Sequence, residues 1–145
     1  MTEYRYSAVA TSSDLKDPGP LTRTVIDYDL TMRRLVPLVT STADWAPLAQ
    51  FVAVDEFSRV GCFLEVQNWP QYLDMLQQWA SATTRFETTV RRISELPGLV
   101  YYEVEERHFR KGHAVTVVNS LTAFGFNAAR KISRLNVYLQ QLLPR

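Results

Sequence analysis

Residues 99–126, LVYYEVEERHFRKGHAVTVVNSLTAFGF, contain two runs of β-branched and aromatic residues on either side of Lys111-Gly112. Such residues favour strands, and glycine supplies the positive φ that a tight hairpin turn needs. The stretch therefore predicts a hairpin of strands 99–110 and 113–126. Similar patterns on both sides extend it to a four-stranded antiparallel meander, with strands at 84–96 and 132–142 and turns at Pro97-Gly98 and 127–131.

The chain before this meander has helical periodicity. Apolar residues at three- and four-residue steps predict a helix over 21–39, a short helix over 43–51 and a third helix over 69–82. Short strands are expected on either side of Gly61. Helices followed by a meander predict an α+β fold, with the helices on the concave face of a curved antiparallel sheet that forms a cone-shaped pocket.

Length and composition fit one domain. The chain has 145 residues, sixteen basic and fifteen acidic, so its net charge of +1 argues against a nucleic-acid partner and gives no reason to expect a membrane partner. Turn-forming residues and the breaker Pro-Gly-Pro predict that residues 1–20 are a tail and 21–145 the domain. A lone cysteine, Cys62, and the lack of a signal peptide or an apolar run of spanning length suggest the cytoplasm.

The order of helix, short helix, strand, helix and long meander resembles that of the nuclear transport factor 2-like superfamily. Three segments carry the likeness: TSTADWAPL at 40–48, Val60-Gly61, and FGFNAARKISRLNVY at 124–138. The resemblance covers about residues 21–142. It implies the cystatin-like roll of SnoaL-like cyclases and scytalone dehydratase, a pocket for a small organic molecule, and a homodimer formed through the sheet.

The catalytic residues of that superfamily are mostly replaced in this chain. The three positions that ketosteroid isomerases use fall on Val36, Ser58 and Thr122, and no set matches the Asp-Arg-Asp relay of limonene epoxide hydrolases. Scytalone dehydratase has a tyrosine seven residues before a histidine, and Tyr101 and His108 reproduce that spacing. Asn119 could match its asparagine on the next strand.

Glu106 and His108 are the main candidates for catalysis. Side chains two residues apart share one face of a strand, so these two lie with Val100, Tyr102 and Val104. A carboxylate beside an imidazole is a workable acid–base pair, and apolar neighbours suit a pocket. The alternative is an exposed ion pair at the strand end. Tyr101, Glu103, Glu105 and Arg107 on the other face are expected in water or at a dimer surface.

The hairpin register decides which residues face this pair, and the sequence leaves two registers open. With Lys111-Gly112 as a two-residue loop, His108 faces Val115 and Val104 faces Asn119. With Arg110 in a three-residue loop, His108 faces Ala114. Ser120 and Thr122 then share its face. A slip of one residue exchanges the two faces of the strand.

The remaining candidates come from other segments. Asp55 is a candidate base if a strand enters the pocket at that point, where this fold often keeps a catalytic acid; the alternative, which we favour, is an acid in the loop after the second helix. Tyr28 lies on the buried stripe of the first helix, and Asp29 and Arg33 are spaced for an i,i+4 ion pair. The predicted ligand-binding residues are Tyr28, Trp79, Tyr102, Asn119, Thr122 and Phe124. The histidines and the cysteine show no metal-ligand spacing, so neither a metal nor another cofactor is expected.

Two functions follow as hypotheses. The first is a cofactor-independent isomerase, cyclase, hydratase or dehydratase that moves protons on a small apolar substrate through His108 and Glu106. The second is a non-catalytic module that binds a ligand or dimerises. The first needs His108 and Glu106 to face a closed cavity, whereas the second predicts an open, wholly apolar or filled cone.

Overall fold

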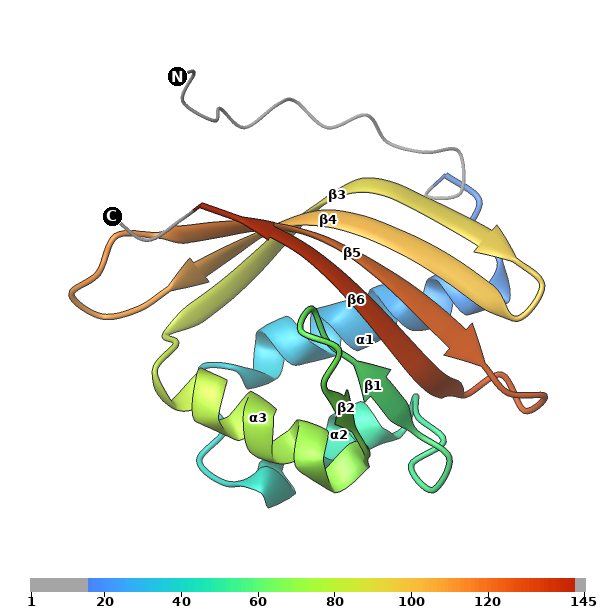
Figure 1. Cartoon of the computed structure of the whole chain (residues 1–145), viewed down its shortest axis with the longest axis horizontal. Helices are drawn as coiled ribbons and strands as arrows, with labels where there is room; N and C mark the ends of the chain where they lie inside the picture. The colour runs from blue at the N-terminus through green and yellow to red at the C-terminus, as the bar shows by residue number, and fades with distance from the viewer. Residues whose placement is uncertain (1–15, 143–145) are drawn as a thin grey trace.

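The computed structural model describes residues 16–142, so most of the expected tail and the last three residues lie outside the described part. Figure 1 shows the helices packed beneath a curved sheet. The elements in chain order are α1 (Pro20–Leu35), the 3-10 helix η2 (Thr42–Trp45), α2 (Ala46–Ala49), β1 (Ser58–Val60), β2 (Val66–Gln67), α3 (Trp69–Ser81), β3 (Arg85–Leu96), β4 (Leu99–Phe109), β5 (Thr116–Phe126) and β6 (Ile132–Gln141).

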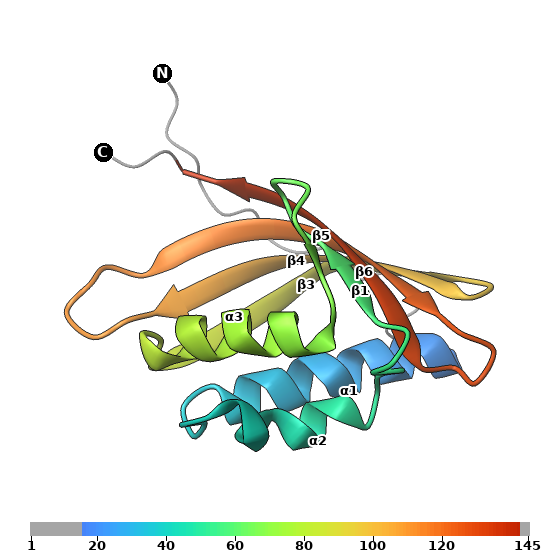
Figure 2. The same ribbon diagram turned by 60° about the horizontal axis from the view of Figure 1, so that its bottom comes forward.

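The sheet has six strands in the order β2-β1-β6-β5-β4-β3. All three helices lie on its concave side, and the other face of the long strands is not covered by a helix of the described chain (Figures 1 and 2). This confirms the α+β prediction of helices under a curved sheet. The sheet is mixed rather than wholly antiparallel, because β1 runs parallel to β6 with Arg59 opposite Leu135. That pairing joins segments distant in sequence, which local patterns do not reveal.

The hairpin between β4 and β5 is wider than either expected loop. His108 faces Thr116 and Val104 faces Ser120, which corrects both predicted registers. A two-residue turn of type I′ needs positive φ at both central positions, but of this pair only Gly112 has it, at 75°. The chain instead turns where the His113 N–H donates to the Arg110 carbonyl at 3.2 Å. The face predicted for Ser120 and Thr122 with the three-residue loop is nevertheless the observed one.

Local chemistry fixes the ends of the two long helices. The Asn68 side chain accepts from the Gln71 N–H at 3.0 Å while Gln71 accepts from the Asn68 N–H at 2.9 Å, a capping box that starts α3. The first turn of α1 is capped from the sheet, because the Thr22 N–H donates to Glu95 of β3 at 2.6 Å. α1 ends at Leu35, earlier than predicted, two residues before Pro37, which cannot continue a helix.

The core lies between the concave face and the helices. Trp45 and Leu48 on the helical side and Ile93 and Val100 of the sheet belong to one core cluster, and all four are at 0% exposure. The indole N–H of Trp45 donates to the Gln77 side chain of α3 at 2.9 Å, so the short α2 region is fastened to the longer helix. No helix within residues 16–142 has the length and apolar character needed to cross a membrane.

Candidate functional site

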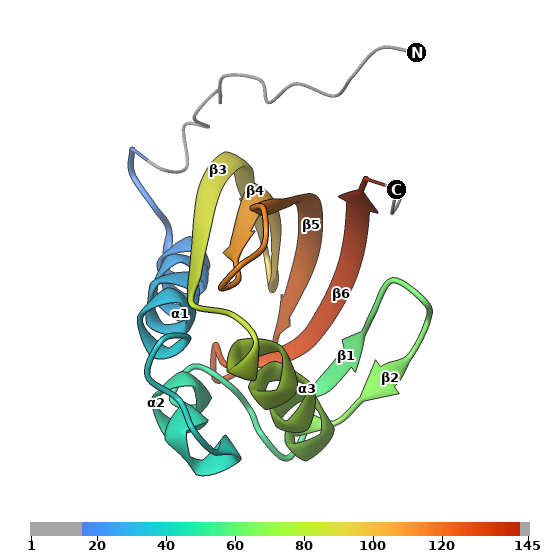
Figure 3. The same cartoon turned by 90° about the vertical axis from the view of Figure 1, so that its left-hand side faces the viewer.

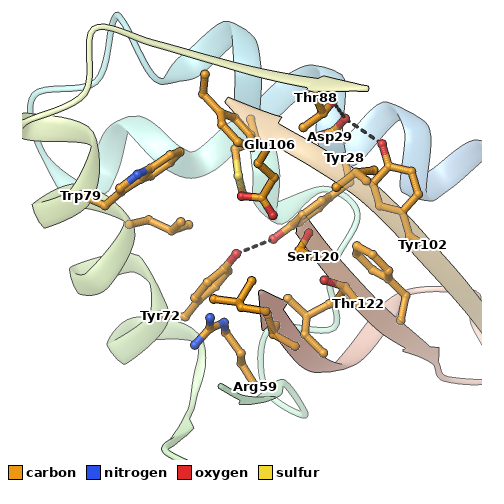
Figure 4. Close-up of a pocket in the computed structure, with 18 of the residues that line it drawn as sticks. Tyr28, Asp29, Arg59, Tyr72, Trp79, Thr88, Tyr102, Glu106, Ser120 and Thr122 are labelled. Atoms are coloured by element: carbon orange, nitrogen blue, oxygen red, sulfur yellow. Dashed lines mark hydrogen bonds between the residues drawn. The ribbon is translucent and has the colours of Figure 1, made fainter. Parts of the chain in front are cut away.

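A cavity of about 240 Å³ opens between α1, α3, β1 and the concave face of the long strands. Figure 3 shows α3 lying across the open end of the sheet, with β1 and β2 beside it. Most of the lining is apolar or aromatic, and Figure 4 shows its polar side chains converging on one space. The cavity thus combines apolar walls with a few polar groups, as ligand pockets do.

A hydrogen-bonded chain runs from α3 to β4 along one wall of the cavity. The Trp79 indole N–H donates to Nδ1 of His108 at 3.0 Å, and Nε2 of His108 lies 3.0 Å from Oε1 of Glu106. An indole N–H only donates, so Nδ1 accepts and carries no proton. Nε2 therefore bears the ring proton, and this N–H donates a hydrogen bond to Glu106. The two hydrogen bonds fix the tautomer of His108.

This chain divides the roles of Glu106 and His108. Both ring nitrogens of His108 are occupied, so the imidazole holds its neighbour and offers no free nitrogen to a ligand. Within residues 16–142, His108 is the only hydrogen-bond partner of the Glu106 carboxylate. Glu106 lines the cavity, and Figure 4 shows its side chain pointing into it. Its second oxygen is thus the group that a ligand would meet.

Two tyrosines form a hydroxyl pair in the same cavity. Tyr28 of α1 and Tyr72 of α3 are buried, and their hydroxyl oxygens lie 3.1 Å apart. Burial raises the pKa of both hydroxyls, so both keep their protons at neutral pH. One proton serves the bond between them, whichever oxygen donates. The other O–H proton is left for an acceptor in the cavity.

Asp29 forms a third polar cluster in the cavity wall, with Thr88 and Tyr102. Its Oδ2 accepts from the Thr88 hydroxyl at 2.6 Å and from the Tyr102 hydroxyl at 2.8 Å, and Arg33 lies 3.6 Å away. Burial raises the pKa of Asp29 although these hydrogen bonds and Arg33 oppose the shift. Burial, and next the charge of Asp29, raise the pKa of the Tyr102 hydroxyl.

We expect Asp29→Asn to increase the free energy of unfolding at neutral pH. A carboxyl whose pKa is raised by folding stabilises the protein below its unfolded pKa, and this contribution is lost as pH rises through the folded pKa. An amide oxygen can still accept from Thr88 and Tyr102 but carries no charge to bury. Urea unfolding at a series of pH values measures the effect.

The pH dependence is the control for the Asp29 prediction. The advantage of Asp29→Asn should shrink as pH falls through the raised pKa of the folded protein toward 3.8, the ordinary pKa of the carboxyl, because the buried wild-type group then becomes protonated. A variant less stable than wild type at pH 7, or equally improved at every pH, would contradict it. The first outcome would mean that Arg33 contributes more than burial costs.

Arg59 of β1 is a further lining residue. It is buried, donates to the Gln67 side chain at 2.9 Å and lies 3.6 Å from the Glu65 carboxylate. Its guanidinium also stands 5.4 Å from the ring centre of Tyr72. The positive charge of Arg59 is therefore already paired within the β1–β2 hairpin.

Seven of the predicted site residues line this one cavity: Tyr28, Trp79, Tyr102, Glu106, His108, Thr122 and Phe124. Two others do not. Asn119 lies on the convex face of β5, opposite Glu105, because the observed register places its even-numbered neighbours inward. Asp55 is exposed in the turn before β1, since β1 begins only at Ser58.

The polar groups that the sequence analysis did not assign to the site are Asp29, Arg59, Tyr72 and Thr88. Asp29 was expected only as a partner of Arg33. The i,i+4 spacing showed that pair but not that the carboxyl also turns toward β3 and β4. The apolar stripe of α3 marked Tyr72 as buried. Its nearness to Tyr28 depends on how the helices pack. No group of three or more metal-ligating side chains gathers anywhere in residues 16–142.

No family model matches the chain, and no curated protein matches its sequence. Solved structures do match its fold. A candidate SnoaL-like polyketide cyclase from Shewanella putrefaciens superposes with a TM-score of 0.69 at 7% identity over 94% of this chain and 92% of that chain. AclR, a candidate hydroxylase from Streptomyces galilaeus, gives 0.68 at 7% identity over 83% and 79%.

A third match is a nuclear transport factor 2-like protein of unknown function from Exiguobacterium. It superposes with a TM-score of 0.63 at 16% identity over 82% of this chain and 99% of that chain. Identities this low establish common architecture and leave activity open. By its architecture, this chain has the nuclear transport factor 2-like fold, in the form seen in SnoaL-like proteins.

Proposed function

We propose that the protein is a cofactor-independent enzyme that transfers protons on a small, largely apolar organic molecule, as an isomerase, cyclase, hydratase or dehydratase. The observation that carries the proposal is Glu106, whose carboxylate is held at one oxygen by His108 and faces the cavity with the other. A fixed carboxylate with a free oxygen is suited to act as a general base.

The Tyr28–Tyr72 pair supplies the complementary group. When a base removes a proton next to a carbonyl, negative charge develops on the carbonyl oxygen. An O–H donor already in place stabilises that charge without further reorganisation. In this proposal Glu106 touches the substrate, the tyrosine pair binds its oxygen, and His108 is a positioning residue rather than the acid or base itself.

The structural relatives support a small-molecule role. Two of them are described as a candidate polyketide cyclase and a candidate hydroxylase, activities whose substrates are organic molecules. The cavity of this chain has about 240 Å³, which suits a molecule of one or two rings rather than a macromolecule.

Deuterium exchange tests the proposal without a known substrate. A panel of cyclic ketones and 1,3-dicarbonyl compounds is first screened for binding by thermal shift, because a ligand that binds the folded state raises Tm. The compounds that bind are then incubated with the protein in D₂O, and loss of their C–H signals is followed by NMR. Exchange faster than in buffer is expected, and binding without exchange for every ligand would end the catalytic proposal.

A non-catalytic ligand-binding module is the second candidate function. It is favoured by one observation, that both nitrogens of His108 are occupied by Trp79 and Glu106. A site built only to bind has no need of a free acid–base nitrogen. Binding without exchange in the same assay would support this function.

We also propose a homodimer formed through the convex face of the sheet. This face carries exposed Tyr101 and Tyr138, at 41% and 62% exposure, and no described helix covers it (Figure 2). Exposed aromatic residues on an uncovered sheet are typical of protein interfaces. Light scattering after size exclusion should give twice the monomer mass, and Tyr138→Glu should shift it toward the monomer. A monomer at all concentrations would contradict the proposal.

A further inference from the structure

We propose that the ligand of this cavity is a small organic cation, a quaternary or protonated amine with apolar substituents, whose charge is bound by Glu106. The inference depends on the proposed function in one respect, that the cavity is the ligand site. It concerns which molecules bind, whether or not they are turned over.

The protonation state of His108 determines whether Glu106 has a positive charge beside it. Because the Trp79 indole N–H donates to Nδ1 at 3.0 Å, a proton on that nitrogen would place two donors against each other. His108 is therefore a neutral imidazole, and its contact with Glu106 is a hydrogen bond without a positive charge. Glu106 accordingly has no cationic partner among residues 16–142.

The other charges at the cavity are already matched. Asp29 lies 3.6 Å from Arg33, and Arg59 lies 3.6 Å from Glu65. With these two pairs set aside, Glu106 is the one charged group lining the cavity that remains without an opposite charge in the described chain. Its side chain is only 19% exposed, so water compensates it incompletely.

The surroundings of Glu106 suit a cation with apolar groups. The cavity is lined by the aromatic rings of Tyr28, Tyr72 and Trp79, which Figure 4 labels, and by those of Phe86 and Phe124. Aromatic rings attract cations through their negative faces, and such cages are used to bind quaternary ammonium ligands. A ligand of this class would place its charge at Glu106 and its alkyl groups against the rings.

A pair of molecules with the same shape and different charge tests the inference. Choline and 3,3-dimethylbutan-1-ol differ in having nitrogen or carbon at the branched centre, so only choline is positively charged. Both are titrated into the wild-type protein by NMR at low salt. We expect choline to bind about tenfold or more tightly, which corresponds to one ion-pair contact reinforced by the rings.

Variants locate the source of that preference. Glu106→Gln keeps the shape of the side chain and removes its charge, so the preference for choline should fall to the smaller part that the aromatic rings contribute. Glu103→Gln makes the same change on the convex face of β4 and should keep the preference. Equal binding of both molecules by the wild-type protein, or a preference that Glu106→Gln leaves undiminished, would overturn the inference.

The state of His108 can be tested separately through the ¹⁵N shifts of its ring. One protonated and one bare nitrogen are expected, whereas two protonated nitrogens at neutral pH would overturn the argument. These outcomes are distinct from those for the proposed catalysis. If neutral carbonyl compounds exchange deuterium while choline shows no preference, the catalytic proposal stands and the cation assignment fails.

Discussion

Glu106→Gln is expected to reduce deuterium exchange into a bound carbonyl compound by about 10²–10⁴-fold, the usual contribution of a general base. The amide of glutamine can still accept the hydrogen bond from Nε2 of His108, so the local structure should persist. It cannot take a proton at neutral pH. The variant should therefore fold normally, and the loss should appear only in the rate of deuterium exchange into the bound compound.

The measurement needs both a structural and a chemical control. Circular dichroism and urea unfolding should show Glu106→Gln folded, with stability close to that of wild type. Glu103→Gln should keep the full exchange rate because its side chain lies on the face of β4 away from the cavity. If Glu106→Gln keeps more than about a tenth of the wild-type rate, another group is the base.

Trp45→Ala is expected to have the largest effect on stability, a loss of about 3–5 kcal/mol in the free energy of unfolding. Trp45 is 0% exposed and is the largest fully buried side chain of the described chain. Truncation leaves a cavity beneath α3 and removes the donor that Gln77 accepts. For a domain of this size the change corresponds to a fall in Tm of about 10–16 °C.

Two further variants separate the contributions at Trp45. Trp45→Phe keeps most of the ring volume but lacks the N–H, so its loss should be smaller than that of Trp45→Ala. Leu38→Ala removes an apolar side chain that is 69% exposed and should change stability little. Urea unfolding measures all three, and a loss below about 1 kcal/mol for Trp45→Ala would show that the site collapses around the smaller residue.

Local sequence patterns predicted the helices and the meander well because each long element carries its own periodicity. The steps of three and four residues in α1 and α3 match the buried stripes of those helices. The predicted length of the β4–β5 loop was wrong. The length depends on the φ of Lys111, which the neighbouring Gly112 does not determine. The parallel pairing of β1 with β6 is a contact between distant segments, and no local rule predicts it.

The candidate site was predictable where a single strand determines it. Alternation along β4 places Glu106 and His108 on one face, and both line the cavity. The prediction for Asn119 depended on the register of the next strand, where one residue of slip reverses the face. Tyr72 and Asp29 enter the cavity from two helices, so their part in it depends on helix packing rather than on the spacing of residues.

The hydrogen bond from the first turn of α1 to Glu95 has a consequence for how the cavity could change its ligand preference. Successive residues of a helix are rotated by about 100°, so fixing Thr22 also fixes the directions in which Tyr28 and Asp29 point about two turns later. Glu95 lies near the end of β3, outside the cavity lining. A substitution there would rotate or shift the helix and so remodel the part of the cavity that Tyr28 and Asp29 line, while every lining residue stayed the same. Selectivity in this chain can therefore be altered from a distance, through the attachment of one helix to the rim of the sheet.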